Sequence, residues 1–313
     1  MLVPSVSLCY IEEKERRVLF MEQITVSGDS NRITGEYFEQ IAIELRQLDC
    51  VPPDTSMELF GKHFETPVMM SPLSHLKPLE SGVPGMTAMA MGAVLSGSVM
   101  WAGMGDEAEL EDILSTGAET IKIIKPYADR DLLYRRMSHA KDSGALAVGV
   151  DIDHAFGDCL GYPMKPLSFG ELAELTRAAG LPFVVKGVLS IQDAEKCVQA
   201  GAAGIVVSHH HGIIRSAVPP LFLLPSIKKA VGRELKIFVD CGIDNGLNAF
   251  KALALGADAI SLGRAVMPVL NESGPEGLSR YVKSVTDELK QAMYRTASPD
   301  LNHIDPSVVH ILN

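Results

Sequence analysis

Short apolar runs recur along the chain, and each of them ends in a polar residue or a glycine. Three successive runs end at Lys186, Ser208 and Asp240, and three histidines follow Ser208 directly. Apolar, β-branched runs of this length are typical of parallel strands that are buried on both faces. The carboxyl ends of such strands carry their functional groups to one edge of the sheet. The pattern therefore predicts that a lysine, a histidine and an aspartate share one site.

From residue 66 onward these runs alternate with amphipathic segments. Strands are predicted at residues 67–71, 93–100, 120–124, 145–151, 182–186, 204–208, 236–240 and 257–262. Helices are predicted at 85–91, 107–115, 129–143, 168–179, 190–200, 220–231, 245–255 and 274–293. Ser168 and Ser190 each open a Ser-x-x-acidic signal for a helix start. Eight strands alternating with eight helices predict a (β/α)8 TIM barrel rather than an open doubly wound sheet.

The first sixty residues lack this alternation. Residues 35–48 are predicted to form a helix with Ile41, Leu45 and Leu48 on its apolar face, and Pro52 and Pro53 follow it. We therefore expect a short N-terminal extension, residues 1–60, packed on a barrel of residues 61–313.

Composition narrows the classes of protein that remain. The 313 residues are 47% hydrophobic and carry a formal net charge of −11, which argues against nucleic acid as a general partner. No apolar run is long enough to span a bilayer, and residues 1–5 do not resemble a signal peptide. The five cysteines are scattered without metal-site spacing, as expected of free thiols. We expect a cytoplasmic protein whose partner is a small molecule, not a membrane.

The predicted strand ends supply the candidate site. They carry Ser71, Asp151, Lys186, Ser208, Asp240 and the pair Gly263 and Arg264. In barrels of this type catalytic groups lie at these ends, and phosphate often binds after strands seven and eight. Glycine lets backbone N–H groups approach an anion, and a guanidinium can hold it with two hydrogen bonds. Gly263 and Arg264 are therefore predicted to bind a phosphate.

His209, His210 and His211 invite a metal interpretation. Successive residues of an extended chain point in alternate directions, so three adjacent histidines rarely share one ion. We predict no metal site. Asp153 and His154, just past the fourth strand, either line the same mouth or lie solvated in a loop.

Several motifs resemble the FMN-dependent α-hydroxy-acid oxidising enzymes, the family of glycolate oxidase and lactate oxidase. The resembling segments are Val-Lys-Gly-Val at 185–188, Val-Ser-His-His at 207–210 and Lys-Ala-Leu-Ala-Leu-Gly-Ala at 251–257. Leu-Gly-Arg at 262–264, Pro-Val-Met-Met-Ser-Pro at 67–72 and Val-Asp at 150–151 are similar to further family motifs. The resemblance covers residues 60–293 and is most specific between 181 and 267.

This resemblance implies roles for individual residues. His210 is implied to take the proton of the substrate hydroxyl, and Asp151 to hold the resulting imidazolium. Lys186 is implied to lie beside the flavin ring where negative charge accumulates. These roles suit the chemistry of the three side chains. Together with Lys186, the residues implied to bind FMN are Ser71, Pro72, Lys125, Ser208, Asp240, Gly242, Gly263 and Arg264.

The chain departs from the family at the positions that bind the substrate carboxylate. Ile213 stands where the family carries an arginine, and Arg215 follows two positions later. Asp244 replaces an arginine of the flavin phosphate site. We expect FMN binding to be retained and the recognition of simple 2-hydroxy acids to be lost or rebuilt. Candidate substrate-binding residues are Tyr127, His154, His211, Ile213 and Arg215.

The predicted function is an FMN-dependent oxidoreductase that acts on an α-hydroxy acid or related alcohol. Two other functions stay open. One is a flavin-dependent isomerase resembling type 2 isopentenyl diphosphate isomerase, and the other is an aldolase-type barrel that binds a sugar phosphate and forms a Schiff base on Lys186. The resemblance also implies a homo-oligomer, a tetramer or an octamer.

Overall fold

A computed structural model describes residues 29–312 of the chain. Residues 1–28, which include Cys9 and the start of the chain, where no signal peptide is predicted, lie outside the described part. None of the described helices is long and apolar enough to cross a membrane.

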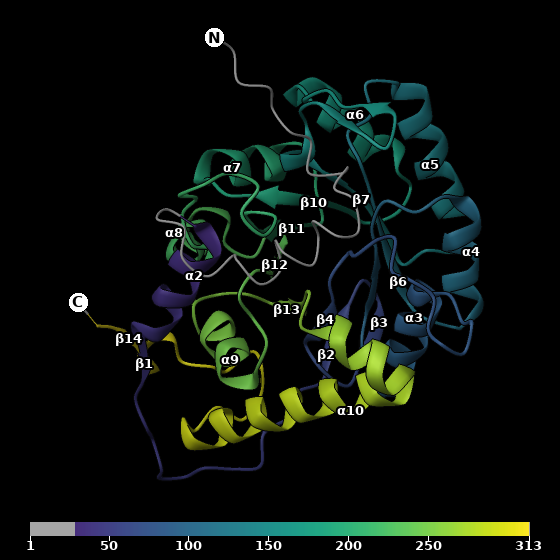
Figure 1. The fold of residues 1–313 in the computed structure, drawn as a ribbon. Helices are drawn as coiled ribbons and strands as arrows, with labels where there is room; N and C mark the ends of the chain where they lie inside the picture. The colour runs from purple at the N-terminus through teal and green to yellow at the C-terminus, as the bar shows by residue number, and fades with distance from the viewer. Residues whose placement is uncertain (1–28, 313) are drawn as a thin grey trace.

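Eight parallel strands form the centre of the fold (Figure 1). In sheet order they are β4 (Val68–Met70), β13 (Ala259–Leu262), β12 (Lys236–Val239), β11 (Gly204–Val207), β10 (Phe183–Val188), β7 (Ala147–Asp151), β6 (Thr120–Ile124) and β5 (Met100–Ala102). A backbone hydrogen bond of 3.0 Å from Met70 to Val99 and a bridge between Leu73 and Ala102 join β4 to β5. The sheet thereby closes into the predicted (β/α)8 barrel.

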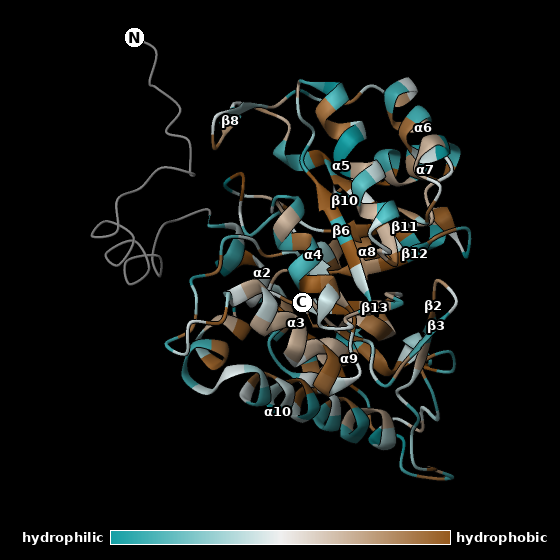
Figure 2. Ribbon diagram, turned by 90° about the vertical axis from the view of Figure 1, so that its right-hand side faces the viewer, coloured by the Kyte–Doolittle hydropathy of each residue, from teal (hydrophilic) through white to brown (hydrophobic). Residues whose placement is uncertain are grey.

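Helices cover the outside of this barrel, and the apolar strands lie within them (Figure 2). They are α3 (Gly85–Ser96), α4 (Glu107–Ser115), α5 (Arg130–Asp142), α6 (Phe169–Ala178), α7 (Ile191–Gln199), α8 (Pro220–Val231), α9 (Gly246–Ala254) and α10 (Val266–Arg295). Ser168 caps α6 in a reciprocal capping box with Glu171, and Ser190 caps α7 through the backbone N–H of Asp193. Both helix starts read from the sequence are thus confirmed.

Side chains, not a channel, fill the barrel interior. Met69, Trp101 and Phe238 are buried there, and the Trp101 and Phe238 rings meet edge to face with centroids 5.3 Å apart. The hairpin of β2 (Met57–Leu59) and β3 (Lys62–Phe64) adds Leu59 and Phe64 to the same cluster. This packing leaves the opposite end of the barrel, at the carboxyl ends of the strands, for function.

Elements at the two chain ends pair with each other. Helix α2 (Ser30–Glu39) leads into β1 (Ile41–Ile43), which is antiparallel to β14 (Val309–Ile311) after the short turn η2 (Pro306–Val308). The β2–β3 hairpin crosses residue 60, and the division at residues 60 and 61 stays a prediction.

Two predicted elements are wrong. The segment 35–48 is not one helix, because α2 ends at Glu39 and residues 41–43 then pair with β14, a strand that lies 266 to 270 residues later in the sequence. Leu45 and Leu48 are exposed, and only Ile41 is buried.

The segment 93–100 is not a strand. Helix α3 continues to Ser96 and ends at Gly97, whose φ of 64° is left-handed, and β5 begins only at Met100. Helix α3 packs between the barrel and α10, but its outer side also carries apolar residues, the exposed Met91, Val94 and Leu95, so its sequence lacks helical periodicity.

Candidate active site

A cavity of about 260 Å³ lies at the carboxyl ends of the barrel strands. Its walls contain many of the predicted site residues, namely Ser71, Pro72, Lys186, His210, His211, Asp240, Gly242, Gly263 and Arg264. A larger hollow, of about 1460 Å³, lies at the amino ends of β12 and β13 and contains none of the predicted site residues. Size therefore does not identify the site, whereas the chemistry of the lining does.

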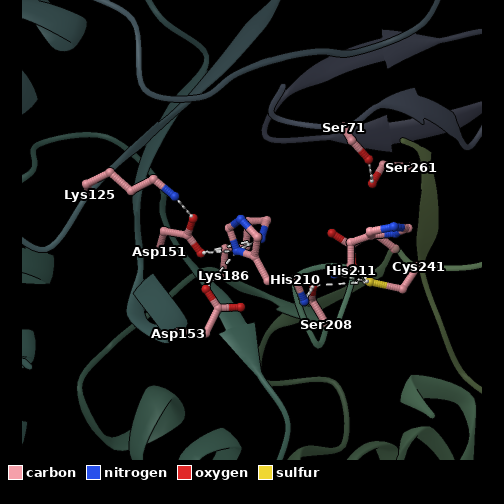
Figure 3. A network of polar contacts seen from close by, with 11 residues as sticks. Ser71, Lys125, Asp151, Asp153, Lys186, Ser208, His210, His211, Cys241 and Ser261 are labelled. Atoms are coloured by element: carbon pink, nitrogen blue, oxygen red, sulfur yellow. Dashed lines mark hydrogen bonds and ion pairs between the residues drawn. The ribbon is translucent and has the colours of Figure 1, made fainter. Parts of the chain in front are cut away.

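Asp151 stands at the centre of a buried ion-pair network (Figure 3). Its Oδ2 accepts a hydrogen bond of 2.6 Å from Lys125 Nζ, and its Oδ1 lies 3.4 Å from Lys186 Nζ. The register of β7 against β10 places Lys186 directly beside Asp151. Burial opposes charge on this carboxyl, yet Lys186 and Lys125 hold the pKa of Asp151 well below its usual range.

His210 follows β11 in a left-handed backbone conformation, with φ of 49°. Its backbone N–H donates to Ser208 Oγ at 3.0 Å, which fixes the turn. Its Nδ1 lies 2.8 Å from Asp153 Oδ1, 3.1 Å from Lys186 Nζ and 3.4 Å from Asp151 Oδ1. Burial and Lys186 disfavour the imidazolium, but the two carboxylates outweigh them and raise the pKa of His210.

Asp153 and His154 come from the single turn η1 (Ile152–His154) that follows β7. The ring of His154 faces that of His210, with centroids 4.6 Å apart. Burial, with Lys125 nearby, lowers the pKa of His154 to about 4, so this ring is neutral at pH 7. Asp153, which the sequence left undecided between the mouth and a solvated loop, lies against His210.

The glycines and Arg264 form the other side of the cavity. Gly263 has open space above its Cα, since a Cβ there would meet only Ser71 Oγ, at 3.7 Å. Gly242 has a left-handed φ of 79°. Burial lowers the pKa of Arg264 to about 10, and no ion pair of this guanidinium is found within residues 29–312. A half-buried cation beside exposed backbone N–H groups suits an anion such as a phosphate.

His209 and His210 contact different partners, and His210 lies in a left-handed turn rather than in extended chain. Its Nε2 lies 2.8 Å from Thr34 Oγ1 of α2, and its Nδ1 accepts a hydrogen bond of 2.9 Å from the backbone N–H of Gly212. Ser30 Oγ of the same helix donates to the carbonyl of Ile214. These bonds attach α2 to the loop that carries His210.

The remaining candidate residues do not line the cavity. Tyr127 is buried and packs against Tyr162 in the hairpin of β8 (Asp158–Cys159) and β9 (Tyr162–Pro163), with ring centroids 5.4 Å apart. Ile213 and Arg215 are exposed on the loop after β11. Their part in substrate binding stays a prediction.

Ligand atoms of Asp151, Asp153 and His210 all lie within 4.8 Å of one another, as they would around a metal ion. Two ammonium groups, from Lys125 and Lys186, already contact Asp151. Positive charge is thus supplied by the protein itself, and we interpret the cluster as an ion-pair and proton network.

The chain resembles known proteins in both sequence and fold. The family model described as FMN-dependent dehydrogenase matches residues 15–159 and 154–311. An L-lactate oxidase from Lactobacillus jensenii is 26% identical over 88% of this chain and 76% of its own length. A glycolate oxidase from Spinacia oleracea is 27% identical over 83% of this chain and 81% of its own. A solved mandelate oxidase mutant with a monooxide FMN adduct superposes with a TM-score of 0.83, at 25% identity, over 94% of this chain and 95% of that one.

Proposed function

This chain belongs to the FMN-dependent dehydrogenase family, and from that premise we propose that His210 is the base of its active site. The protein is an FMN-dependent oxidoreductase of the α-hydroxy-acid oxidase type. The family match favours this function over the isomerase and the aldolase-type barrel that the sequence left open. The observation that carries our assignment is the position of His210, which lines the cavity while its Nδ1 is held by carboxylates.

The residues present fit FMN. Gly242, Gly263 and Arg264 offer backbone N–H groups and a partly buried cation to the phosphate, which compensates for Asp244 in place of an arginine. Lys186 is buried and cationic, as suits a ring system that becomes anionic on reduction. Ser71, Pro72, Lys125, Ser208 and Asp240 are proposed to complete the cofactor site.

FMN, when bound, supplies the acceptor for the hydride that leaves the substrate α-carbon. The chain supplies the proton acceptor. Because Nδ1 of His210 faces carboxylates, Nε2 is the nitrogen left for the substrate hydroxyl, whose proton it takes as the carbonyl product forms. Asp151 and Asp153 stabilise the resulting imidazolium. Lys186 balances the negative charge of Asp151.

Substrate recognition is proposed to differ from that of glycolate or lactate oxidation. A carboxylate entering a water-poor pocket needs a paired donor, since an unpaired buried charge costs several kcal/mol. Ile213 offers none at the position where the family has an arginine. We propose a larger or less charged alcohol, or a 2-hydroxy acid held by Arg215, Lys125 or the neighbouring histidines.

Cofactor binding provides the first test. The purified protein should carry the visible absorbance of oxidised flavin, and the apoprotein should bind FMN at micromolar concentration. Replacing Arg264 by Met should weaken that binding, whereas the same change at Arg233, which lines the hollow at the opposite end of the barrel, should not. Apoprotein that does not bind FMN would refute the assignment.

Assembly and location are further proposals. Family membership leads us to propose a homo-oligomer, a tetramer or an octamer, and the exposed side chains of Phe222 and Ile214, 57% and 65% accessible, are candidates for its interface. Gel filtration that shows a monomer at all concentrations would contradict it. Four free cysteines among the described residues support a cytoplasmic location.

A further inference from the structure

Two carboxylates face His210, and they are not equivalent. Asp151 is engaged on both oxygens by lysines, at 2.6 Å from Lys125 and 3.4 Å from Lys186, and is 3.4 Å from His210 Nδ1. Asp153 approaches the same nitrogen at 2.8 Å, closer than the ammonium of Lys186, which lies 3.1 Å away, can only donate and so favours the opposite tautomer. The shorter contact, and the one within the normal range for a hydrogen bond, therefore belongs to Asp153.

The backbone of β10 leaves space for the Asp153 carboxylate because residue 187 is a glycine. The register of β10 against β11 shifts between Lys186 and Val188, and Gly187 between them has a left-handed φ of 88°. A Cβ at Gly187 would lie 2.5 Å from Asp153 Cγ and 2.6 Å from its Oδ2. Any side chain at residue 187 would thus displace the Asp153 carboxylate from His210.

Asp153 also depends on Lys186 and on its hydrogen-bond partner His210 for its charge. Its Oδ2 is buried and has no hydrogen-bond partner among the described residues, which leaves Oδ1 and its imidazole partner as the polar contact of this carboxylate. Burial and the nearby charge of Asp151 raise the pKa of Asp153. A carboxylate in these surroundings is stabilised when the imidazole beside it is protonated.

We propose that Asp153 is the positioning residue of His210, fixing the Nδ1–H tautomer and stabilising the imidazolium, while Asp151 serves as the counter-ion of Lys125 and Lys186. This assignment rests on the proposed role of His210 Nε2 as base. The resemblance in sequence gives the imidazolium-holding role to Asp151, and the geometry transfers it to Asp153. The arrangement resembles a carboxylate that holds a catalytic histidine in the productive tautomer.

The test is an NMR titration of the His210 ring nitrogens in FMN-loaded protein with ¹⁵N-labelled histidine. The groups that face this ring are Lys186 from β10, Asp151 from β7, and Asp153 and His154 from η1. In the wild type the neutral ring should carry its proton on Nδ1. In Asp153→Asn the proton affinity of the ring should fall about tenfold or more, and the neutral tautomer should shift toward Nε2–H.

Asp151→Asn should leave the proton on Nδ1, because Asp153 remains in contact. An Asp153→Asn protein whose tautomer is unchanged and whose proton affinity stays within about twofold of the wild type would overturn the proposal. The proposal would also be overturned if the Nδ1–H tautomer were lost in Asp151→Asn but kept in Asp153→Asn. The titration requires no turnover, so it tests the role of Asp153 separately from the proposed function. A protein that oxidises no hydroxy acid would refute the proposed function, but it would not show which carboxylate holds His210.

A second pair of variants tests the same geometry if Asp153→Asn does not fold. Gly187→Ala and Gly201→Ala both place a side chain at a left-handed position, with φ of 88° and 82°. Only the first would meet Asp153, since the second has no neighbour closer than Thr176 Oγ1 at 4.0 Å. Gly187→Ala should reproduce the tautomer shift of Asp153→Asn, and Gly201→Ala should not. Equal tautomers in the two alanine variants would overturn the proposal.

Discussion

Lys186 is almost completely buried, and it touches both partners of the proton network, Asp151 and His210. Burial alone would lower the pKa of this ammonium, but Asp151 and Asp153 raise it, so Lys186 stays charged throughout the working range of the enzyme. A fixed positive charge beside a cofactor favours the form of that cofactor that carries negative charge.

We therefore predict that Lys186→Met weakens FMN binding and lowers the reduction potential of bound FMN. The control is Lys236→Met, which makes the same change at the amino end of β12, where the lysine pairs with Asp258 on the far side of the barrel. Equilibrium titration with FMN and a dye-coupled potential measurement would show both effects. Unchanged affinity and potential in Lys186→Met would exclude this role.

Much of the site at the residue scale could be predicted from the sequence. Lys186, Ser208 and Asp240 end β-branched runs, and strand ends converge in a barrel whatever the helices do. The contact between Asp153 and His210 could not be predicted, because it depends on the register shift at Gly187. The pair of aspartates two residues apart was the available signal, but spacing alone does not tell which carboxylate reaches the histidine.

At the scale of elements, helix α2 is attached to the loop of His210 through His209. The His209 ring donates from Nε2 to Thr34 and accepts at Nδ1 from Gly212, a pattern that only the neutral ring can satisfy. Burial lowers the pKa of His209, while Asp240 and Asp29 oppose that effect. Protonation of His209 would break the Gly212 bond and loosen the loop.

This lowered pKa predicts a pH dependence of stability. The unfolded chain, with a histidine pKa of about 6.5, binds the proton more readily than the folded protein, so stability falls as the pH drops below that value. One such group contributes at most about 1.4 kcal/mol per pH unit. His209→Asn should therefore lose less unfolding free energy between pH 7 and pH 5 than the wild type does.

Urea unfolding at the two pH values measures this difference. His154 has a pKa lowered to about 4 and acts in the same direction, but it is present in both proteins and cancels in the comparison. Equal losses of stability in the wild type and His209→Asn would contradict the prediction.

Elements were predicted best where the local pattern agrees with the tertiary surroundings. Strand β6 was predicted with its observed bounds, since Thr120–Ile124 is a short buried run between two amphipathic helices. The pattern failed in α3, which carries apolar residues on its exposed side as well as on its buried side, and in β1, whose partner β14 lies near the other end of the chain. Local periodicity contains no information on either of these contacts.

At the scale of the whole molecule, the barrel brings strands β6, β7, β10, β11 and β12 together at one mouth, while β4 and β13 complete the cavity. The count of alternating elements was sufficient to predict this architecture, because few folds accommodate eight βα units. Substrate choice was not predictable to the same degree, since it depends on loops such as the one that carries Ile213 and Arg215.

The central claim is that His210 takes the hydroxyl proton of a substrate that FMN oxidises. The most direct measurement is anaerobic stopped-flow reduction of FMN-loaded wild type and His210→Ala by a panel of 2-hydroxy acids and neutral alcohols. We predict saturable reduction of the wild type by at least one compound, with glycolate and lactate poor. His210→Ala should retain FMN and be slower by about two to four powers of ten. Equal reduction rates in the two proteins, or a wild type that no compound reduces, would contradict the account.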